Sequence, residues 1–112
     1  MDMQRGFDEG SLVLLTLHSP RQKFFGLLRR LNAAGVELRG LPLESLEDLA
    51  RQIRAGEAAT ASTLFFPMHR VEKMELDAAA GELPSLAESF ASQARRTVED
   101  VFDESGGGER RG

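Results

Sequence analysis

Histidines, serines and carboxylates are the side chains with which this chain could perform nucleophilic, acid–base or metal chemistry. His18 and His69 lack the spacing of a metal-binding helix, and the sequence contains no cysteine. No serine lies in a G-x-S-x-G setting, and most carboxylates fall in predicted helices or tails, where solvated charge is expected. The glycines at 106–108 precede no helix that could cradle a phosphate. We therefore predict no catalytic residue, metal site, cofactor or small-molecule substrate, and a protein that is not an enzyme.

Charge is distributed unevenly along the chain, whose net charge is −4. Residues 1–20 carry one base and three acids, residues 21–76 nine bases and seven acids, and residues 77–112 four bases and eight acids. The centre is therefore slightly basic between two acidic flanks. A local anion site is compatible with this pattern, but it is not the strong positive field of a typical nucleic-acid-binding protein.

The location of the protein is predicted from its apolar runs and its first residues. The first ten residues are acidic and polar, unlike the basic start of a secretory signal. The longest apolar run, at 12–17, has six residues, against the about 20 needed to span a bilayer. We expect no membrane association and a cytoplasmic location. Twelve arginines against two lysines, with abundant alanine and glycine, indicate a bacterial source.

Five short apolar or alternating runs predict β-strands, at 11–17, 23–31, 36–41, 62–68 and 70–76. Gly26, inside the second run, marks a bulge, a sharp bend or a close backbone approach. Residues 32–35 form a short turn that predicts a hairpin between the second and third runs. Pro67 breaks the fourth run, so the fourth and fifth strands should meet at a tight corner.

Two segments have helical periodicity instead. The first, at 45–55, has an apolar stripe, a capping box from Ser45 to Asp48, and Gly56 as terminator. The second, at 85–102, begins with a capping box from Ser85 to Glu88. We therefore predict a mainly β protein with added helices, of class α+β and order β-β-β-α-β-β-α. Its five strands, with a strongly bent second strand, should form a small, highly curved barrel or half-barrel.

The domain organisation follows from these elements. Residues 1–10 are predicted to be a flexible tail, residues 11–104 a single domain, and the glycine-rich segment 105–112 a disordered tail.

Two stretches of the chain resemble the signatures of Sm-like proteins. KFFGLLRRLNAAGVELRGL, at 23–41, resembles the first signature, with a glycine in a bent second strand, a polar turn and an alternating third strand. The matching positions are Gly26, Leu28, Asn32, Gly35, Val36 and Leu38. LFFPMHRVEKMEL, at 64–76, resembles the second signature, and its His69-Arg70-Val71 is similar to the turn of Hfq-type bacterial members. The helix at 45–55 would be an insertion, the C-terminal helix an addition, and the helix that usually precedes the first strand is missing.

The resemblance implies a five-stranded, strongly bent small barrel of Sm-like or SH3-like type. It also implies assembly and RNA binding. Sm-like subunits join edge to edge into rings, the fourth strand of one pairing with the fifth of the next. That arrangement makes four residues candidates for a homo-oligomer interface: Phe65, Phe66, Val71 and Lys73. Sm-like proteins also bind single-stranded RNA with the turns after the second and fourth strands. The corresponding candidates in this chain are Asn32, Gly35, His69 and Arg70.

Each candidate also has a plainer interpretation. His69 and Arg70 could contact RNA, or could simply be solvated charges in an exposed turn. Arg29 and Arg30 are adjacent in a strand and should point to opposite faces, so they are not expected to form one basic patch. One phenylalanine of each pair, Phe24-Phe25 and Phe65-Phe66, should pack in the core, and the other should meet a helix, another subunit or water. The alternative function is therefore a small-barrel protein-interaction or assembly module without RNA affinity.

Overall fold

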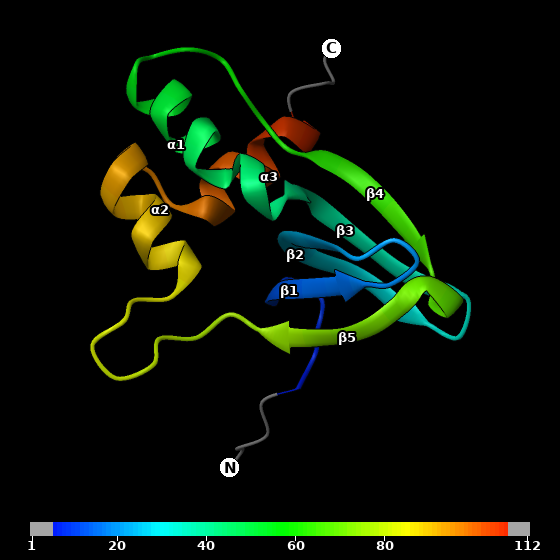
Figure 1. Ribbon diagram of the computed structural model, residues 1–112. Helices are drawn as coiled ribbons and strands as arrows, with labels where there is room; N and C mark the ends of the chain where they lie inside the picture. The colour runs from blue at the N-terminus through cyan, green and yellow to red at the C-terminus, as the bar shows by residue number, and fades with distance from the viewer. Residues whose placement is uncertain (1–5, 108–112) are drawn as a thin grey trace.

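The computed structural model describes the backbone of residues 6–107 and the side chains of residues 6–103. Five strands form one antiparallel sheet: β1 Leu12–Leu17, β2 Gln22–Asn32, β3 Gly35–Pro42, β4 Ser62–Pro67 and β5 Val71–Leu76 (Figure 1). The five predicted strands are confirmed within one or two residues at each end. Their order in the sheet is β4-β3-β2-β1-β5, so β4 and β5 are the two outer strands.

The sheet is strongly curved. β4 and β5 lie on opposite edges, yet only the 3₁₀ turn η2, Met68–Arg70, separates them in the chain. The edges must therefore approach each other at that corner. Phe66 from β4 and Val71 from β5 accordingly pack against the same buried cluster on the inner face. The predicted α+β class and the order of the five strands and the first helix are confirmed, but no ladder joins β4 to β5 in the described residues, so the sheet is not closed into a barrel.

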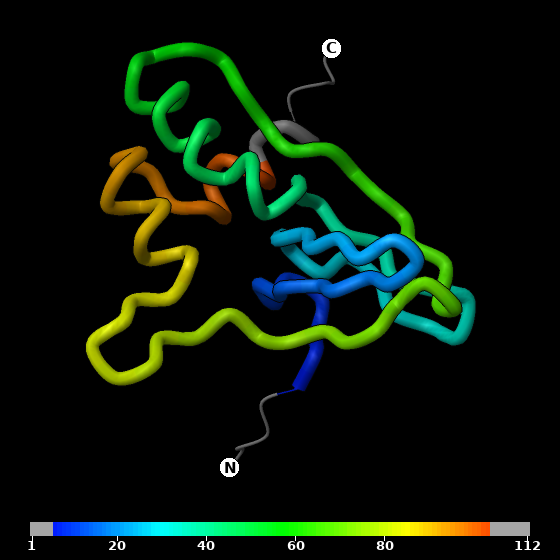
Figure 2. Tube along the Cα trace, in the orientation of Figure 1, coloured from blue at the N-terminus to red at the C-terminus, as the bar shows by residue number. Residues whose placement is uncertain are grey.

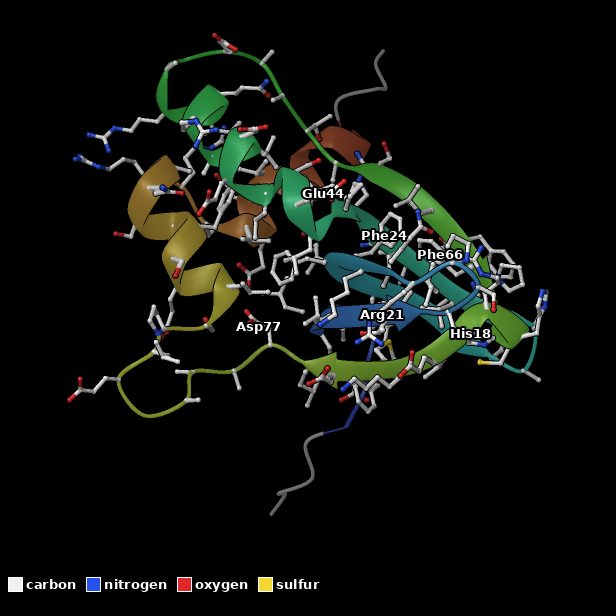
Figure 3. All side chains as sticks on the ribbon, viewed as in Figure 1. His18, Arg21, Phe24, Glu44, Phe66 and Asp77 are labelled. Carbon is white, nitrogen blue, oxygen red and sulfur yellow. The ribbon has the colours of Figure 1, made fainter. Side chains whose placement is uncertain are left out.

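The inner face is built from apolar residues that alternate along the strands. Leu15 faces Phe24, and Leu28 faces Leu38, across adjacent strands. The fully buried members of this inner core come from the first three strands: Val13, Leu15, Leu17, Leu28, Val36 and Leu38. The rings of Phe24 and Phe66 lie with their centroids 4.7 Å apart at its margin (Figure 3). No helix takes part in this cluster.

The outer face is covered by helices at one end. These are η1 Leu43–Ser45, α1 Leu46–Arg54, α2 Leu86–Ala94 and α3 Val98–Gly107. Phe25 and Leu27 of β2 are buried beneath them, in a cluster that includes Leu49, Phe90 and Phe102. The helices lie together, away from the β4–β5 corner (Figure 1). Each helix therefore buries its apolar stripe on the sheet or on another helix.

Two helical expectations need correction. The single helix predicted at 85–102 is two helices, because the backbone turns left-handed at Arg95, with φ of 66°. Ser45 does not cap α1: it ends the preceding 3₁₀ turn with helical backbone angles, whereas a capping side chain requires an extended residue. The capping box of Ser85 and Glu88 is confirmed. Gly56 ends the first helix as predicted, with φ of 86°.

Asp77 ties the end of β5 to the start of α2. Its two carboxylate oxygens accept hydrogen bonds from the backbone N–H groups of Leu86 and Ala87, at 2.8 and 2.9 Å. Figure 3 shows Asp77 where the chain leaves β5. Two N–H groups of the first helical turn are thereby satisfied, beside the favourable end of the helix dipole.

The predicted tails fall partly outside the described residues. Residues 1–5 of the first tail and 108–112 of the second lie there. Residues 6–10 are exposed, and the N–H of Gly10 donates to the carbonyl of Leu28 at 2.7 Å. Residues 105–107 belong to α3. No helix within 6–107 is long and apolar enough to cross a membrane.

Candidate interaction site at the hairpin end of the sheet

Three turns meet at one end of the sheet, which we call the hairpin end: residues 18–21, residues 33–34 and η2 (Figure 2). Two backbone hydrogen bonds hold them together. The N–H of Met68 donates to the Ala34 carbonyl at 2.9 Å, and the N–H of His18 donates to the Arg70 carbonyl at 3.0 Å. The four residues predicted to contact RNA therefore lie at one end of the molecule, as antiparallel hairpins require.

Arg70 clasps the turn between β1 and β2. Its Nε donates to the carbonyl of His18 at 2.8 Å, and its Nη2 donates to the carbonyl of Pro20 and to the side chain of Gln22 at 3.2 and 3.3 Å. The residue is half-buried. Its guanidinium is thus bound to two backbone carbonyls and one side chain of its own chain. Arg70 is first a structural tie, a role for which the sequence carried no signal.

Asn32 and Gly35 shape their turn. The side-chain oxygen of Asn32 accepts from the N–H groups of Ala34 and Gly35, at 2.9 and 3.3 Å, which is an Asx turn. Gly35 is buried, and a Cβ there would collide with the Phe66 carbonyl and the Phe65 ring. Both residues therefore have local structural roles, and only Asn32 remains exposed to a ligand.

His69 is the predicted contact residue whose side chain is both exposed and without a hydrogen bond to any described residue. Other cations nearby are partly neutralised. Arg21 approaches Glu72 at 3.7 Å, and Lys73 approaches Glu75 at 3.5 Å. The positive field at the hairpin end is therefore weak, in line with the charge balance of the sequence.

The four residues predicted at an oligomer interface divide into two kinds. Phe66 and Val71 are half-buried against the inner core of their own chain. Phe65 and Lys73 are exposed, Phe65 with 56% of its surface accessible. In each phenylalanine pair, one ring packs against the inner core and the other lies on the outer face of the sheet, as expected. Phe25 meets helices, whereas nothing in the described chain covers most of Phe65.

The two adjacent arginines correct a prediction. On β2 and β3, Leu28 pairs with Leu38 and Arg30 pairs with Glu37. Two steps along β2 therefore match one step along β3, and Arg29 is the extra residue of a β-bulge. The bulge breaks the alternation, and both arginines lie on the outer face. Arg29 reaches Asp103 of α3, on that face, at 3.5 Å. Gly26 marks a close backbone approach instead: a Cβ there would lie 2.8 Å from the Cα of Gly40.

No group of three or more histidines, cysteines or carboxylates among the described residues could hold a metal ion. No protein-family model, no curated protein and no solved structure matches this chain. Function must therefore be argued from the geometry.

Proposed function

We propose that this protein is a non-enzymatic Sm-like domain that assembles by pairing β4 of one copy with β5 of the next. The observation that carries the proposal is that β4 and β5 are the two outer strands of one curved sheet. Unpaired strand edges are normally covered or charged. β4 contains no charged residue and bears the exposed Phe65.

The family assignment is supported by local features that the resemblance leads one to expect. β2 is long and crosses β3 closely where Gly26 faces Gly40. A polar Asx turn follows β2, and a three-residue corner joins β4 to β5. The inserted α1 and the added α2 and α3 all cover the outer face, leaving both edges open.

Edge pairing would continue the inner core from one copy to the next. Leu64 and Phe66 face inward on β4, and Met74 and Leu76 face inward on β5, because they pair with inner-face residues. Leu76 is 37% exposed. Joining β4 to a second copy's β5 brings these side chains into one apolar layer. Because the two edges differ, the contact is head-to-tail and closes into a ring when the rotation permits.

The experiment is a mass measurement in solution, by light scattering and sedimentation. We expect an oligomer for the wild type, and a monomer or a much weaker oligomer for Leu76→Lys, since a lysine on an edge strand opposes pairing. Leu31→Lys is the matched control, because Leu31 is 43% exposed but lies on β2, which is not an outer strand. Thermal melting establishes that each variant is folded. A monomeric wild type at about 100 μM would overturn the proposal.

Single-stranded RNA is a second candidate ligand, favoured by the gathering of the three turns and by the exposed His69. A ring would repeat this weak cationic end around its axis, which would raise avidity. Arg70 is a poor test position because its substitution also releases the 18–21 turn. His69→Glu is the better variant, with Arg51→Glu on α1 as the control.

Labelled oligo-A and oligo-U at low and moderate salt provide the RNA measurement. RNA binding predicts a salt-sensitive complex that His69→Glu weakens and Arg51→Glu leaves unchanged. Absence of binding at about 50 mM salt would exclude RNA as a ligand, because electrostatic affinity is greatest at low salt. That result would favour the alternative function, an assembly module without RNA affinity.

A further inference from the structure

A groove of about 580 Å³ lies between α1, α2 and the loop that leads into α2. Leu46, Pro84, Leu86 and Phe90 supply its apolar lining, and Ser89, Ser92 and Gln93 supply its uncharged polar lining. Its charged lining residues are both acids, Glu47 and Glu88. Pockets of about 300–1,000 Å³ with an apolar lining and a few polar groups are typical binding sites. This groove therefore fits a partner that presents an apolar side chain beside a cation.

The charge of the surrounding segments supports this chemistry. Residues 77–94, which form the loop and α2, contain three acids and no base. The groove end of the domain is therefore acidic, and Figure 1 shows α2 on the opposite side of the molecule from the hairpin end. At the hairpin end, Arg30 is the exposed arginine of β2 that lies away from α3, whereas Arg29 contacts Asp103 and Arg39 donates to the Phe102 carbonyl of that helix.

An apolar side chain beside a cation is present at the hairpin end. Phe65 on β4 pairs with Glu37 on β3, which pairs with Arg30 on β2, so all three lie on the outer face. Phe65 is 56% exposed. Arg30 is exposed and makes no hydrogen bond or ion pair with the described residues. At about 4.8 Å between strands, the two backbones are roughly 10 Å apart.

We propose that the groove between α1 and α2 receives the Phe65–Arg30 surface of a second copy of this chain. Phe65 would cover the apolar lining near Leu86, and Arg30 would face Glu47 or Glu88. Because the two surfaces lie on opposite sides of one molecule, they cannot satisfy each other within it. The contact is therefore intermolecular and head-to-tail. It is separate from the pairing of β4 with β5, and it accounts for the outer-face ring of Phe65, which strand pairing alone leaves bare.

Charge exchange tests the contact. Glu47→Arg and Arg30→Glu should each weaken self-association about tenfold or more, because each places like charges together. An equimolar mixture of the two variants should recover association, since the reversed groove of one then meets the reversed surface of the other. Glu99→Arg, an acid-to-base change on α3, is the control and should have no effect. Sedimentation velocity at about 50 and 300 mM salt measures all four samples, and salt should weaken the contact.

The same series in the Leu76→Lys background separates this contact from edge pairing. If the Leu76→Lys variant with an unchanged groove still self-associates, the second interface is confirmed even if edge pairing does not occur. Unchanged association of both single variants, or no recovery on mixing, would overturn the proposal and leave the groove to a different partner or to none. Melting temperatures near that of the wild type would show that neither variant acts by unfolding.

Discussion

The two ends of the sheet's outer face carry the same residue type in opposite environments. Phe25, at the helical end, is fully buried, and its ring lies 6.1 Å from that of Phe102. Phe65, at the hairpin end, faces the same side and is 56% exposed. Around it the uncovered face is polar, with Arg30 and Glu37 as its neighbours across the strands.

Side-chain type on this face follows helix coverage, with Phe65 and Arg39 as exceptions. Phe25 and Leu27 lie beneath the helices, where Arg39 also donates to the Phe102 carbonyl of α3, and Arg30 and Glu37 lie where no helix covers the sheet. A large exposed ring within a charged surface loses the favourable free energy of burial. The groove proposal begins from this residue, because a second copy would restore the coverage that the helices provide elsewhere.

The largest predicted effect separates these two phenylalanines. Phe25→Ala removes a fully buried ring from the helical core and should lower the free energy of unfolding by about 3–5 kcal/mol. Phe65→Ala should change the stability of the monomer by less than about 0.5 kcal/mol, as exposed positions usually do. Urea denaturation at a protein concentration below that of self-association measures both. Equal losses would show that Phe65 is as buried as Phe25 and would remove the contrast.

How far the sequence predicts this fold depends on whether a feature is local. Strand alternation, helical periodicity and turn residues are local, and they placed all five strands and the first helix. The break at Arg95 has no such signal, because a left-handed residue there is usually glycine or asparagine. The bulge at Arg29 also has no signal in the sequence. Without the bulge, strict alternation would put the two adjacent arginines on opposite faces.

The candidate site was predictable in position but not in chemistry. Turns that follow β2 and β4 must lie at one end of an antiparallel sheet, so the sequence was enough to bring Asn32 near His69. The partners of Arg70 were not visible, because two of them are backbone carbonyls of a turn about 50 residues away. Helix coverage, which decides the environment of Phe65, is also a property of the tertiary structure.

An intermediate effect is expected at the hairpin end, where polar contacts replace the helical cover. Arg70→Ala removes the donors to His18 and Pro20 and should cost about 1–2 kcal/mol of stability. The carbonyls left behind can reach water, which limits the loss. Arg21→Ala is the matched control: Arg21 is exposed and only approaches Glu72 at 3.7 Å, so its loss should cost less than about 0.5 kcal/mol.

Hydrogen exchange of the 18–21 turn locates the effect of Arg70→Ala. Faster exchange there, with unchanged exchange beneath α2, would confirm that the clasp acts at one end only. A cost as small as that of Arg21→Ala would show that the three hydrogen bonds of Arg70 contribute little to stability.

The smallest predicted effect has the opposite sign and concerns Thr16, the buried polar residue of the described chain. It is fully buried on β1, and its Oγ1 has no hydrogen-bond partner among the described residues. A buried hydroxyl without a partner costs about 1–3 kcal/mol. Thr16→Val keeps the shape and removes that cost, so it should raise the free energy of unfolding by about 1 kcal/mol. Thr63→Val is the control of opposite sign, because the Thr63 hydroxyl accepts from Nη1 of Arg39 at 2.9 Å. Chemical denaturation of both variants measures these free energies of unfolding. If Thr16→Val is destabilising, the Thr16 hydroxyl has a hydrogen-bond partner, and the outer face has a polar contact between its helix-covered end and its uncovered end.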